Sequence, residues 1–477
     1  MNDQKQLLSI SKKAFLNVIY ILLVLILSAG ILSLFISPGE FLRDSNGMVI
    51  SGTFTFIDDV NYPFWRWFTA PFEVLVGPDA LSVIMIGLFL IILGGTFGLM
   101  HQTGGIKVII NRLIYRFRNN KYTLLRMIIL IFMIFGAFFG IFEESIALLP
   151  ILIILSLSMG WDTMTGMGMC LLAAGFGFAT AITNPFSIGI ASDLANTNIL
   201  NGVFYRLIVF IIMYGVLQFF LVAYAKKIEK NPEKSLTYDE DLKKKQELKE
   251  EVDFKVNDEN KIFNTYVILF IILLIGIVTT GLLELIFSLS IPAIPVMAAI
   301  FLIGGLISGY LVTKNMKYTL KTYLQGMLGV APAFLLILLA VSVKHIISNA
   351  QIMDTILYYL SNMLEGSSPI VAILFIYLFV LIIQFFIGSA SAKAFLIMPI
   401  ILPLVSLIGI SSELAILAFI FGDGYTNVIF PTNGVLLIGL SIASVSYSKW
   451  FKFTYKLQLA TLLLTVVFLI IGIWIGY

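Results

Sequence analysis

The stretch AFIFGDGYTNVIFPTNGV (residues 418–435) lies where a membrane-spanning helix is expected, yet it contains Asp423, two asparagines, one proline and three glycines. Hydrocarbon cannot satisfy free backbone N–H and C=O groups, so a broken backbone at that depth must line a cavity walled by protein. Charged and amide side chains inside a span are costly to place there, and they mark functional positions. The stretch therefore predicts a polar site in the middle of a membrane protein.

A second stretch, GFGFATAITNPFSIG (residues 175–189), has the same character. Each stretch contains a Thr-Asn pair followed by a helix breaker: Thr183-Asn184 precedes a proline, and Thr432-Asn433 precedes a glycine. Matching interruptions in two halves of a hydrophobic chain are typical of the binding site of a secondary transporter.

The composition is that of a polytopic membrane protein. Hydrophobic residues make up 59% and charged residues 12% of the 477 positions, whereas a soluble domain has about 25% charged residues. The small net charge of +3 gives no sign of nucleic-acid binding. The single cysteine, Cys170, excludes an internal disulfide or a thiolate metal site. The sequence has no HExxH, P-loop or nucleophile-elbow motif, which argues against an enzyme or an ATP-driven pump.

Polar segments divide the chain into four parts. A first span and an external loop precede a first repeat, a charged linker and a second repeat. The linker has ten lysines and eleven acidic residues, which predicts a solvated cytoplasmic segment. The interrupted segments have arms too short to cross a bilayer, so each repeat is expected to contain a re-entrant hairpin and then a broken helix. The predicted parts are residues 1–80, repeat 1 at 81–225 (hairpin about 124–159, broken helix about 162–200), the linker 226–261, and repeat 2 at 262–477 (hairpin about 369–408, broken helix about 412–445).

A shift of 249 residues relates the two halves. It takes Pro150 to Pro399 and Glu144 to Lys393, and it superimposes the two Thr-Asn pairs without a gap. Two lysines before the first span place the N-terminus in the cytoplasm, and the linker then lies inside as well. Counting spans from there inverts the second half relative to the first. We therefore expect an all-α polytopic membrane protein built from two inverted repeats.

Glu143 and Glu144 form an acidic pair at the tip of the first predicted hairpin. Two carboxylates placed close together resist simultaneous ionisation, which is useful for proton coupling. The pair could bind a proton, a sodium ion or a cationic group of the substrate. The alternative is structural: one glutamate forms a salt bridge with Lys393 at the other tip.

Neutral hydrogen-bonding side chains cluster at the two breaks. Helix N-termini facing a cavity favour a carboxylate, and unwound carbonyls can hold Na⁺, which we would place near Asn184 and Asn433. The alternative is that these side chains cap the broken helix ends. The residues expected to contact substrate here are Thr183, Asn184, Ser187, Thr426, Asn427, Thr432 and Asn433.

Asp423, between two glycines, is the most specific single candidate. It could anchor a positive group of the substrate or the coupling cation, or it could pair with Lys393. Ser389 and Ser391 join the candidate site because they lie beside Lys393 at the second tip. No cofactor is expected beyond coupling to H⁺ or Na⁺.

Four segments resemble the YfcC family, which is related to anaerobic C4-dicarboxylate carriers and belongs to the ion transporter superfamily. The segments are GIFEESIALLP (140–150), TNPFSIGIAS (183–192), GSASAKAFLIMP (388–399) and FGDGYTNVIFPTNGVL (421–436). The likeness runs over residues 81–457. It implies a homodimer in the inner (plasma) membrane, with a scaffold domain at the dimer interface and a transport domain that moves as an elevator. Superfamily dicarboxylate transporters with Ser-Asn-Thr at both hairpin tips have no match in this sequence.

The resemblance leaves the substrate open, because its members are described both as basic amino acid antiporters and as dicarboxylate carriers. The primary hypothesis is a secondary transporter for a small amino acid of the arginine, ornithine or lysine type, working by exchange or by proton or sodium coupling. In the alternative, a C4-dicarboxylate carrier, Lys393 binds a carboxylate and the glutamates carry protons. An ion channel is the third hypothesis. The expected partners are the small solute, the lipid bilayer and a second copy of the chain.

Overall fold

The computed structural model describes residues 12–43, 50, 52–57, 60, 62–78, 80–117, 120–247, 259–287, 293–364 and 367–477. Within these residues the fold is helical apart from one two-stranded sheet, β1 (Gly39–Glu40) with β2 (Thr55–Phe56). Eight of the described helices are long and apolar enough to cross a membrane. The expectation of a multi-pass α-helical membrane protein is therefore confirmed.

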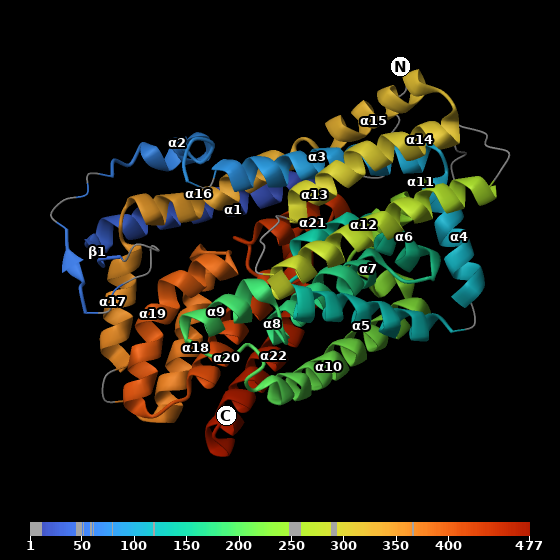
Figure 1. Cartoon of the computed structure of the whole chain (residues 1–477). Coiled ribbons are helices and arrows are strands. Elements are labelled where there is room, and N and C mark those ends of the chain that lie inside the picture. The colour runs from blue at the N-terminus through green and yellow to red at the C-terminus, as the bar shows by residue number, and fades with distance from the viewer. Residues whose placement is uncertain are drawn as a thin grey trace.

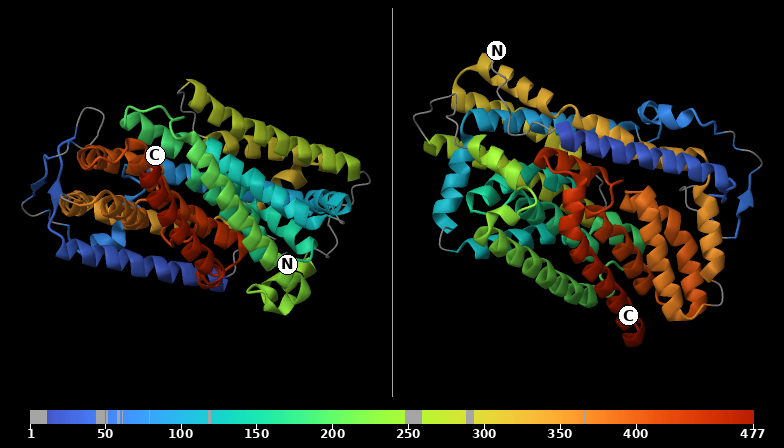
Figure 2. Two further views of the ribbon diagram at one scale, coloured as in Figure 1. Left: turned by 90° about the horizontal axis from the view of Figure 1, so that it is seen from below. Right: turned by 180° about the vertical axis from the view of Figure 1, so that it is seen from behind.

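One layer of helices runs along one side of the molecule, at the top of Figure 1 and again in the view from behind in Figure 2. Within it α1 packs on α16, and α3 packs on α15. A Cβ on Gly326 of α15 would lie 2.4 Å from the carbonyl oxygen of Gly94 in α3, so these two backbones approach closely because both residues are glycine. The helices outside the two bundles and the linker are α1 (Lys12–Phe35), α2 (Arg66–Glu73), α3 (Ala80–Gln102), α4 (Gly105–Phe117), α12 (Glu259–Phe287), α13 (Ala293–Ala299), η5 (Ile300–Gly304), α14 (Gly305–Thr313), α15 (Met316–Val330), α16 (Ala333–Asn349) and α17 (Met353–Leu364).

Two bundles lie beneath this layer in Figure 1. Each contains two consecutive helices, a third helix that ends in a break, a shorter helix after the break and a long final helix. The first bundle has α5 (Lys121–Phe139), η1 (Glu143–Leu148), α6 (Leu149–Ser158), α7 (Thr163–Met167), η2 (Gly168–Leu172), α8 (Ala173–Thr180), η3 (Pro185–Gly189), α9 (Ile190–Leu194) and α10 (Val203–Lys230). The second has α18 (Pro369–Phe386), α19 (Ala390–Ile408), α20 (Ser412–Gly424), η6 (Tyr425–Val428), α21 (Gly434–Ala443) and α22 (Tyr447–Ile475).

The chain reverses direction between α5 and α6. The continuous helix Thr163–Thr180 runs parallel to α5 and antiparallel to α6, so α5 and α6 are antiparallel to each other. The turn begins at Gly140, whose φ of +69° favours glycine. The neighbouring positions that give these directions are Met133 with Gly177, Ala137 with Thr183, Ile153 with Gly166, and Ser145 with Cys170.

The second bundle follows the same plan at the opposite end of the molecule. α18 and α19 lie toward the left of Figure 1, whereas α5 and α6 lie toward the right. The helix pieces α4 and α17 lie at opposite ends as well, each turned across the direction of the long helices. The helix after the second break, Gly434–Ala443, lies 249 residues after the helical segment 185–194 that follows the first break.

The two broken helices cross through a reciprocal contact. A Cβ on Gly175 would lie 2.3 Å from Val428, and a Cβ on Gly424 would lie 2.3 Å from Ala179. Gly424 and Val428 are the positions 249 residues after Gly175 and Ala179. Each half thus presents the same two positions to the other, as in an isologous two-fold contact.

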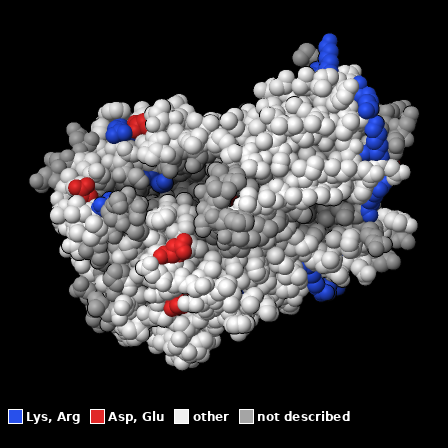
Figure 3. All heavy atoms as spheres, in the orientation of Figure 1, with Lys and Arg blue, Asp and Glu red and all other residues white. Residues whose placement is uncertain are grey.

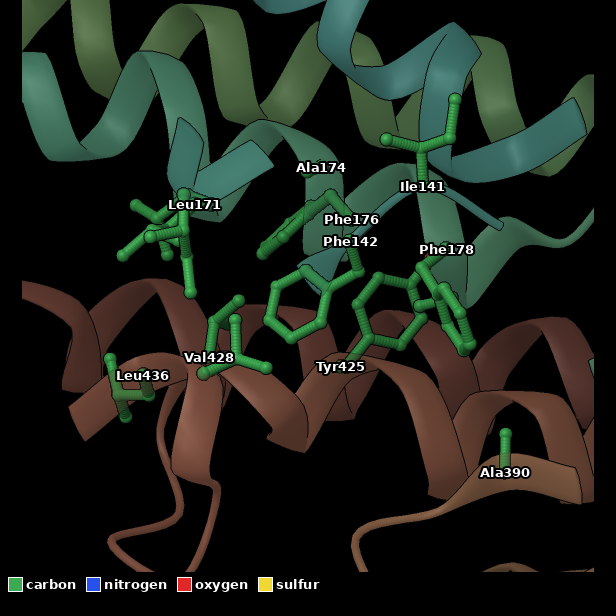
Figure 4. Packing of buried hydrophobic residues seen from close by; sticks show 14 of the residues in the cluster. Ile141, Phe142, Leu171, Ala174, Phe176, Phe178, Ala390, Tyr425, Val428 and Leu436 are labelled. Carbon is green, nitrogen blue, oxygen red and sulfur yellow. The ribbon is translucent and has the colours of Figure 1, made fainter. Parts of the chain in front are cut away.

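Aromatic side chains fill the space around this crossing, as Figure 4 shows for Phe142, Phe176, Phe178 and Tyr425. The rings of Phe176 and Tyr425 meet edge to face with their centroids 5.2 Å apart. Such pairs add about 0.5–1.5 kcal/mol to the burial of the rings. The crossing is therefore a packed, largely aromatic core between the halves.

The charged linker differs from the solvated segment predicted above. Its described part contains the short helix η4 (Pro232–Lys234) and α11 (Tyr238–Glu247). Asp241 and Lys244 on α11 are buried, with 4% and 8% of their surface exposed. Their charges are compensated by hydrogen bonds to the first bundle, and Lys244 is bonded to the second as well, which a count of charges along the sequence does not reveal. Residues 248–258 of the predicted linker lie outside the described residues.

Candidate functional site

Asn184 and Asn433 cap the helices that follow the two breaks. The Oδ1 atom of Asn184 accepts a hydrogen bond from the backbone N–H of Phe186 at 2.9 Å. The Oδ1 atom of Asn433 accepts one from the backbone N–H of Leu436 at 3.0 Å. Both asparagines are buried. The capping alternative is thus part of what these residues do, because helix starts leave N–H groups that need acceptors.

Capping leaves unpaired donors at the first break. The Nδ2 of Asn184 and the Oγ of Ser187 are buried and have no hydrogen-bond partner among the described residues. Buried polar groups are rarely left unpaired without a reason. The free group of Asn184 is an N–H donor, which suits an anion and cannot ligate Na⁺. A sodium ion near Asn184 would have to rely on backbone carbonyls.

At the second break, amide side chains converge on one oxygen. The Oδ1 of Asn427 accepts hydrogen bonds from Nδ2 of Asn433 at 2.8 Å and from Nε2 of Gln384 at 2.5 Å. The Oε1 of Gln384 is buried without a partner in the described part of the chain. Sequence reasoning missed Gln384, although a glutamine within the otherwise apolar α18 is a signal of the kind that marks functional positions.

Lys393 and Asp423 form a fully buried ion pair, with Nζ 2.5 Å from Oδ1. The same ammonium donates a hydrogen bond to the carbonyl of Ile387 at the second tip, at 2.8 Å. Neither carboxylate oxygen of Asp423 accepts a well-directed hydrogen bond from the described residues, so the contact is ionic. Of the two alternatives for Asp423, the structure contains the pairing with Lys393.

Glu143 and Glu144 begin η1, directly after the turn at Gly140. Glu143 is exposed and Glu144 is half-buried. No ion pair joins either glutamate to another described residue, so neither forms the predicted alternative bridge to Lys393. The Oε2 of Glu144 is buried and has no hydrogen-bond partner within the described residues.

The tip of each helix pair lies beside the break of the other half. η1 and α6 pack against α21, and α19 packs against η3 and α9. Ser391 joins two of these elements directly, because its Oγ donates to the carbonyl of Phe186 at 3.1 Å. The residues predicted from the two tips and the two breaks therefore gather on neighbouring elements.

The remaining predicted residues have local partners. Thr183 donates from its backbone N–H to Ala137 and from its hydroxyl to Phe138, which ties the first break to α5. Ser389 is exposed and caps α19, Thr426 donates to the carbonyl of Gly422, and Thr432 is half-buried. Among the described residues no group of three or more His, Cys, Asp or Glu side chains could hold a metal ion.

The described residues contain eight candidate spans, one of which is the first broken helix, Thr163–Thr180. With the buried charges and unpaired amides at the two breaks, these spans define a multi-pass membrane protein of the transporter class. The family model described as "C4-dicarboxylate anaerobic carrier" (DcuC) matches residues 15–474, and the chain belongs to this family. The resemblance inferred from the four motifs is confirmed.

The chain is also similar to curated proteins and to a solved structure. "Putative basic amino acid antiporter YfcC" of Escherichia coli (strain K12) is 30% identical over 80% of this chain and 76% of its own length. An uncharacterized protein of Haemophilus influenzae is 26% identical over 82% of this chain and 76% of its own. The crystal structure of the Alcanivorax borkumensis YdaH transporter aligns with 97% of this chain and 99% of that chain, with 17% identity and a TM-score of 0.42.

Proposed function

We propose that this protein is a secondary active transporter for a small basic amino acid, of the arginine, ornithine or lysine type. The observation that supports this most is the acidic pair Glu143 and Glu144, which lacks an ionic partner among the described residues. Lys393 and Asp423 neutralise each other, so the glutamates leave a formal charge of about −2 if all four groups ionise. Because one oxygen of Glu144 is buried, a cationic substrate, a proton or sodium would have to balance the charge of that residue.

In this proposal the two ends of the amino acid bind to different groups. The donors left unpaired by capping, Nδ2 of Asn184 and Oγ of Ser187, receive the carboxylate. Glu143 and Glu144 receive the ammonium or guanidinium group. The name of the Escherichia coli relative, "Putative basic amino acid antiporter YfcC", supports the same substrate class and an exchange mechanism.

We propose further that the two halves are inverted repeats with re-entrant hairpins, and that the broken helices move as an elevator against the layer of α1, α3, α15 and α16. The reciprocal contact of Gly175 and Gly424 supports the inversion. Basic side chains line one edge of the molecule, at the right of Figure 3. That edge would face the cytoplasm together with the N-terminus. A homodimer in the inner membrane, with this layer at the interface, completes the proposal.

The second candidate is a C4-dicarboxylate carrier, which the description of the family model favours. In that case Lys393 would bind a substrate carboxylate, and it would first have to leave Asp423. A dianion would also add to the negative charge unless at least two protons or cations entered with it.

Counterflow in proteoliposomes loaded with unlabelled solute tests the proposal. Labelled arginine, ornithine or lysine should enter faster when the vesicles contain a basic amino acid than when they are empty. Such acceleration also excludes an ion channel. Exchange driven by succinate or fumarate, with all three basic amino acids inert, would replace the proposal with the dicarboxylate carrier.

A further inference from the structure

The linker helix α11 is attached to both bundles, although it is the most polar helix described. Seven of its ten residues are charged, and the segment 226–261 that contains it has ten lysines and eleven acidic residues. An isolated helix of this composition would stay in water. Two of its charged side chains, Asp241 and Lys244, instead lie inside the protein, where a charge is retained only with compensating partners.

Asp241 binds the start of the helix Thr163–Thr180. Its Oδ2 accepts hydrogen bonds from the backbone N–H of Thr163 at 3.0 Å and from the hydroxyl of Thr237 at 2.7 Å. Its Oδ1 accepts a hydrogen bond from the hydroxyl of Thr163. A carboxylate at a helix N-terminus is favourable because the free N–H groups and the helix dipole are positive there.

A second carboxylate at the same helix end faces the linker. Asp162 caps the helix by accepting from the backbone N–H of Thr165 at 2.8 Å. Its other oxygen accepts from the hydroxyls of Tyr224 and Ser235, each at 2.7 Å. The start of this broken helix is therefore joined to α10 and to the linker at the same time.

Lys244 connects this helix start to the other half of the chain. Its Nζ donates to the hydroxyl of Thr163 at 2.9 Å and to the backbone carbonyl of Ala443 at 2.6 Å. Ala443 is the last residue of α21, where free carbonyls and the negative end of the dipole favour a cation. The ion pair between Lys449 of α22 and Glu240 adds a third attachment, with 2.6 Å between the charged atoms.

These attachments lie at the ends of the broken helices that are remote from the breaks. α21 has ten residues, so Ala443 lies about 15 Å from the break at Asn433. The helix Thr163–Thr180 has 18 residues, which places the first break about 27 Å from Thr163. Each helix is a rigid rod, so contacts that fix the distance between these two attached ends also fix the distance between the two breaks.

We propose that α11 is a fixed part of the substrate-binding body, and that Asp241 and Lys244 are positioning residues. These two residues join the start of one broken helix to the end of the other, and so they fix the distance and orientation between the two breaks. The linker helix therefore moves together with the broken helices during transport. The inference holds for any solute that binds between the breaks, and its failure is therefore distinct from that of the proposed substrate.

The first test compares exchange kinetics in proteoliposomes, with whichever solute the counterflow screen identifies. Lys244→Met should raise the half-saturation concentration about tenfold, equivalent to ~1.4 kcal/mol of binding energy, with a smaller change in maximal rate. Lys244→Arg should restore affinity because it keeps a cation at Ala443. Lys243→Met, a change at the exposed neighbour, should match wild type. Wild-type half-saturation in Lys244→Met, or loss of affinity in Lys243→Met as well, would overturn the proposal.

The second test does not depend on the folding of Lys244→Met. Glu240→Cys and Lys449→Cys are combined in a Cys170→Ala background and joined with a flexible bis-maleimide. Exchange should survive the cross-link, because α11 and α22 never separate in a fixed body. Loss of exchange in the cross-linked protein, with normal exchange in the two single-cysteine variants after the same treatment, would show that α11 must detach, and would overturn the proposal.

Discussion

Lys393 and Asp423 form an ion pair in which both side chains are fully buried, with 2.5 Å between Nζ and Oδ1. The pair has no counterpart in the first half, because Glu144 and Ala174 are the residues 249 positions earlier. One half thus neutralises this buried charge, whereas at the matching position of the other half Glu144 has no cationic partner among the described residues. Because of this asymmetry, we place the positive group of the substrate beside Glu144 and Glu143.

Replacing one partner of the Lys393–Asp423 ion pair should destabilise the fold, whereas replacing both partners should destabilise it much less. Lys393→Met or Asp423→Leu alone is expected to lower the free energy of unfolding by about 3–5 kcal/mol, since either change leaves a buried charge unpaired. The double variant should recover most of that loss, because two apolar side chains then replace two charges. Thermal unfolding of the purified protein in detergent measures all three. A double variant less stable than both single variants would contradict the structural role of the pair.

The acidic pair should control exchange without controlling folding. We expect Glu144→Gln and Glu143→Gln to abolish exchange or to remove its pH dependence, because each removes a charge that the substrate or a proton would balance. Size-exclusion chromatography should show that the variants remain folded. Glu233→Gln, at an exposed position of the linker, is the matched control and should exchange normally. Unchanged exchange and pH profile in both tip variants would remove the glutamates from the site.

Much of the fold could be predicted because its signals are local. Each Thr-Asn pair stands at an interruption in the structure, and Asn184 and Asn433 themselves cap the next helix. A helix breaker acts on its own segment, so one sequence is enough to locate it. The turn at Gly140 likewise falls in the interrupted segment where the sequence placed a tip.

The pairing of side chains could not be predicted in the same way. The sequence offers the pairing of Asp423 with Lys393 only as one of two alternatives, because the residues are thirty positions apart, and the packing of α19 on α20 decides that they meet. Asp241 and Lys244 stand in a run of charges that is typical of a solvated segment, and only the docked helix reveals their partners. Sequence patterns show which residues are unusual, whereas contacts between helices depend on three-dimensional packing.

Accessibility should differ between the two tips if the repeats are inverted. In a Cys170→Ala background, Glu143→Cys should react with a membrane-impermeant maleimide from the cytoplasmic side, and Gly388→Cys from the outer side. Gly388 suits a cysteine because a Cβ there meets no atom within 4 Å. Gly140 does not, since a Cβ would lie 2.4 Å from Oδ1 of Asn184. Lys243→Cys in the linker marks the cytoplasmic side. Labelling of both tips from one side would refute the inversion.

At the proposed outer face, Glu73 of α2 should make stability depend on pH. Glu73 accepts hydrogen bonds from Arg66 and Thr69, each at 2.6 Å, and lies 3.2 Å from His345 of α16. The hydrogen bond from Arg66 is the main cause that lowers the pKa of Glu73 from 4.5 to about 2. A carboxyl group with a lowered pKa stabilises the fold above its unfolded pKa, and this contribution is lost as the pH falls from 4.5 toward about 2.

Glu73→Gln should therefore unfold at a lower temperature than wild type at about pH 6, and the difference should shrink at about pH 3, where the carboxyl group of the unfolded chain is protonated. Differential scanning fluorimetry in detergent at both pH values measures this convergence. Glu40→Gln, at an exposed position of β1, should follow wild type at both. If the difference in unfolding temperature between Glu73→Gln and wild type were the same at both pH values, the ionised carboxylate would not be what holds α2 against α16. The attachment would then rest on the apolar contacts of Trp67 and Ala70, which are buried beneath the same helix.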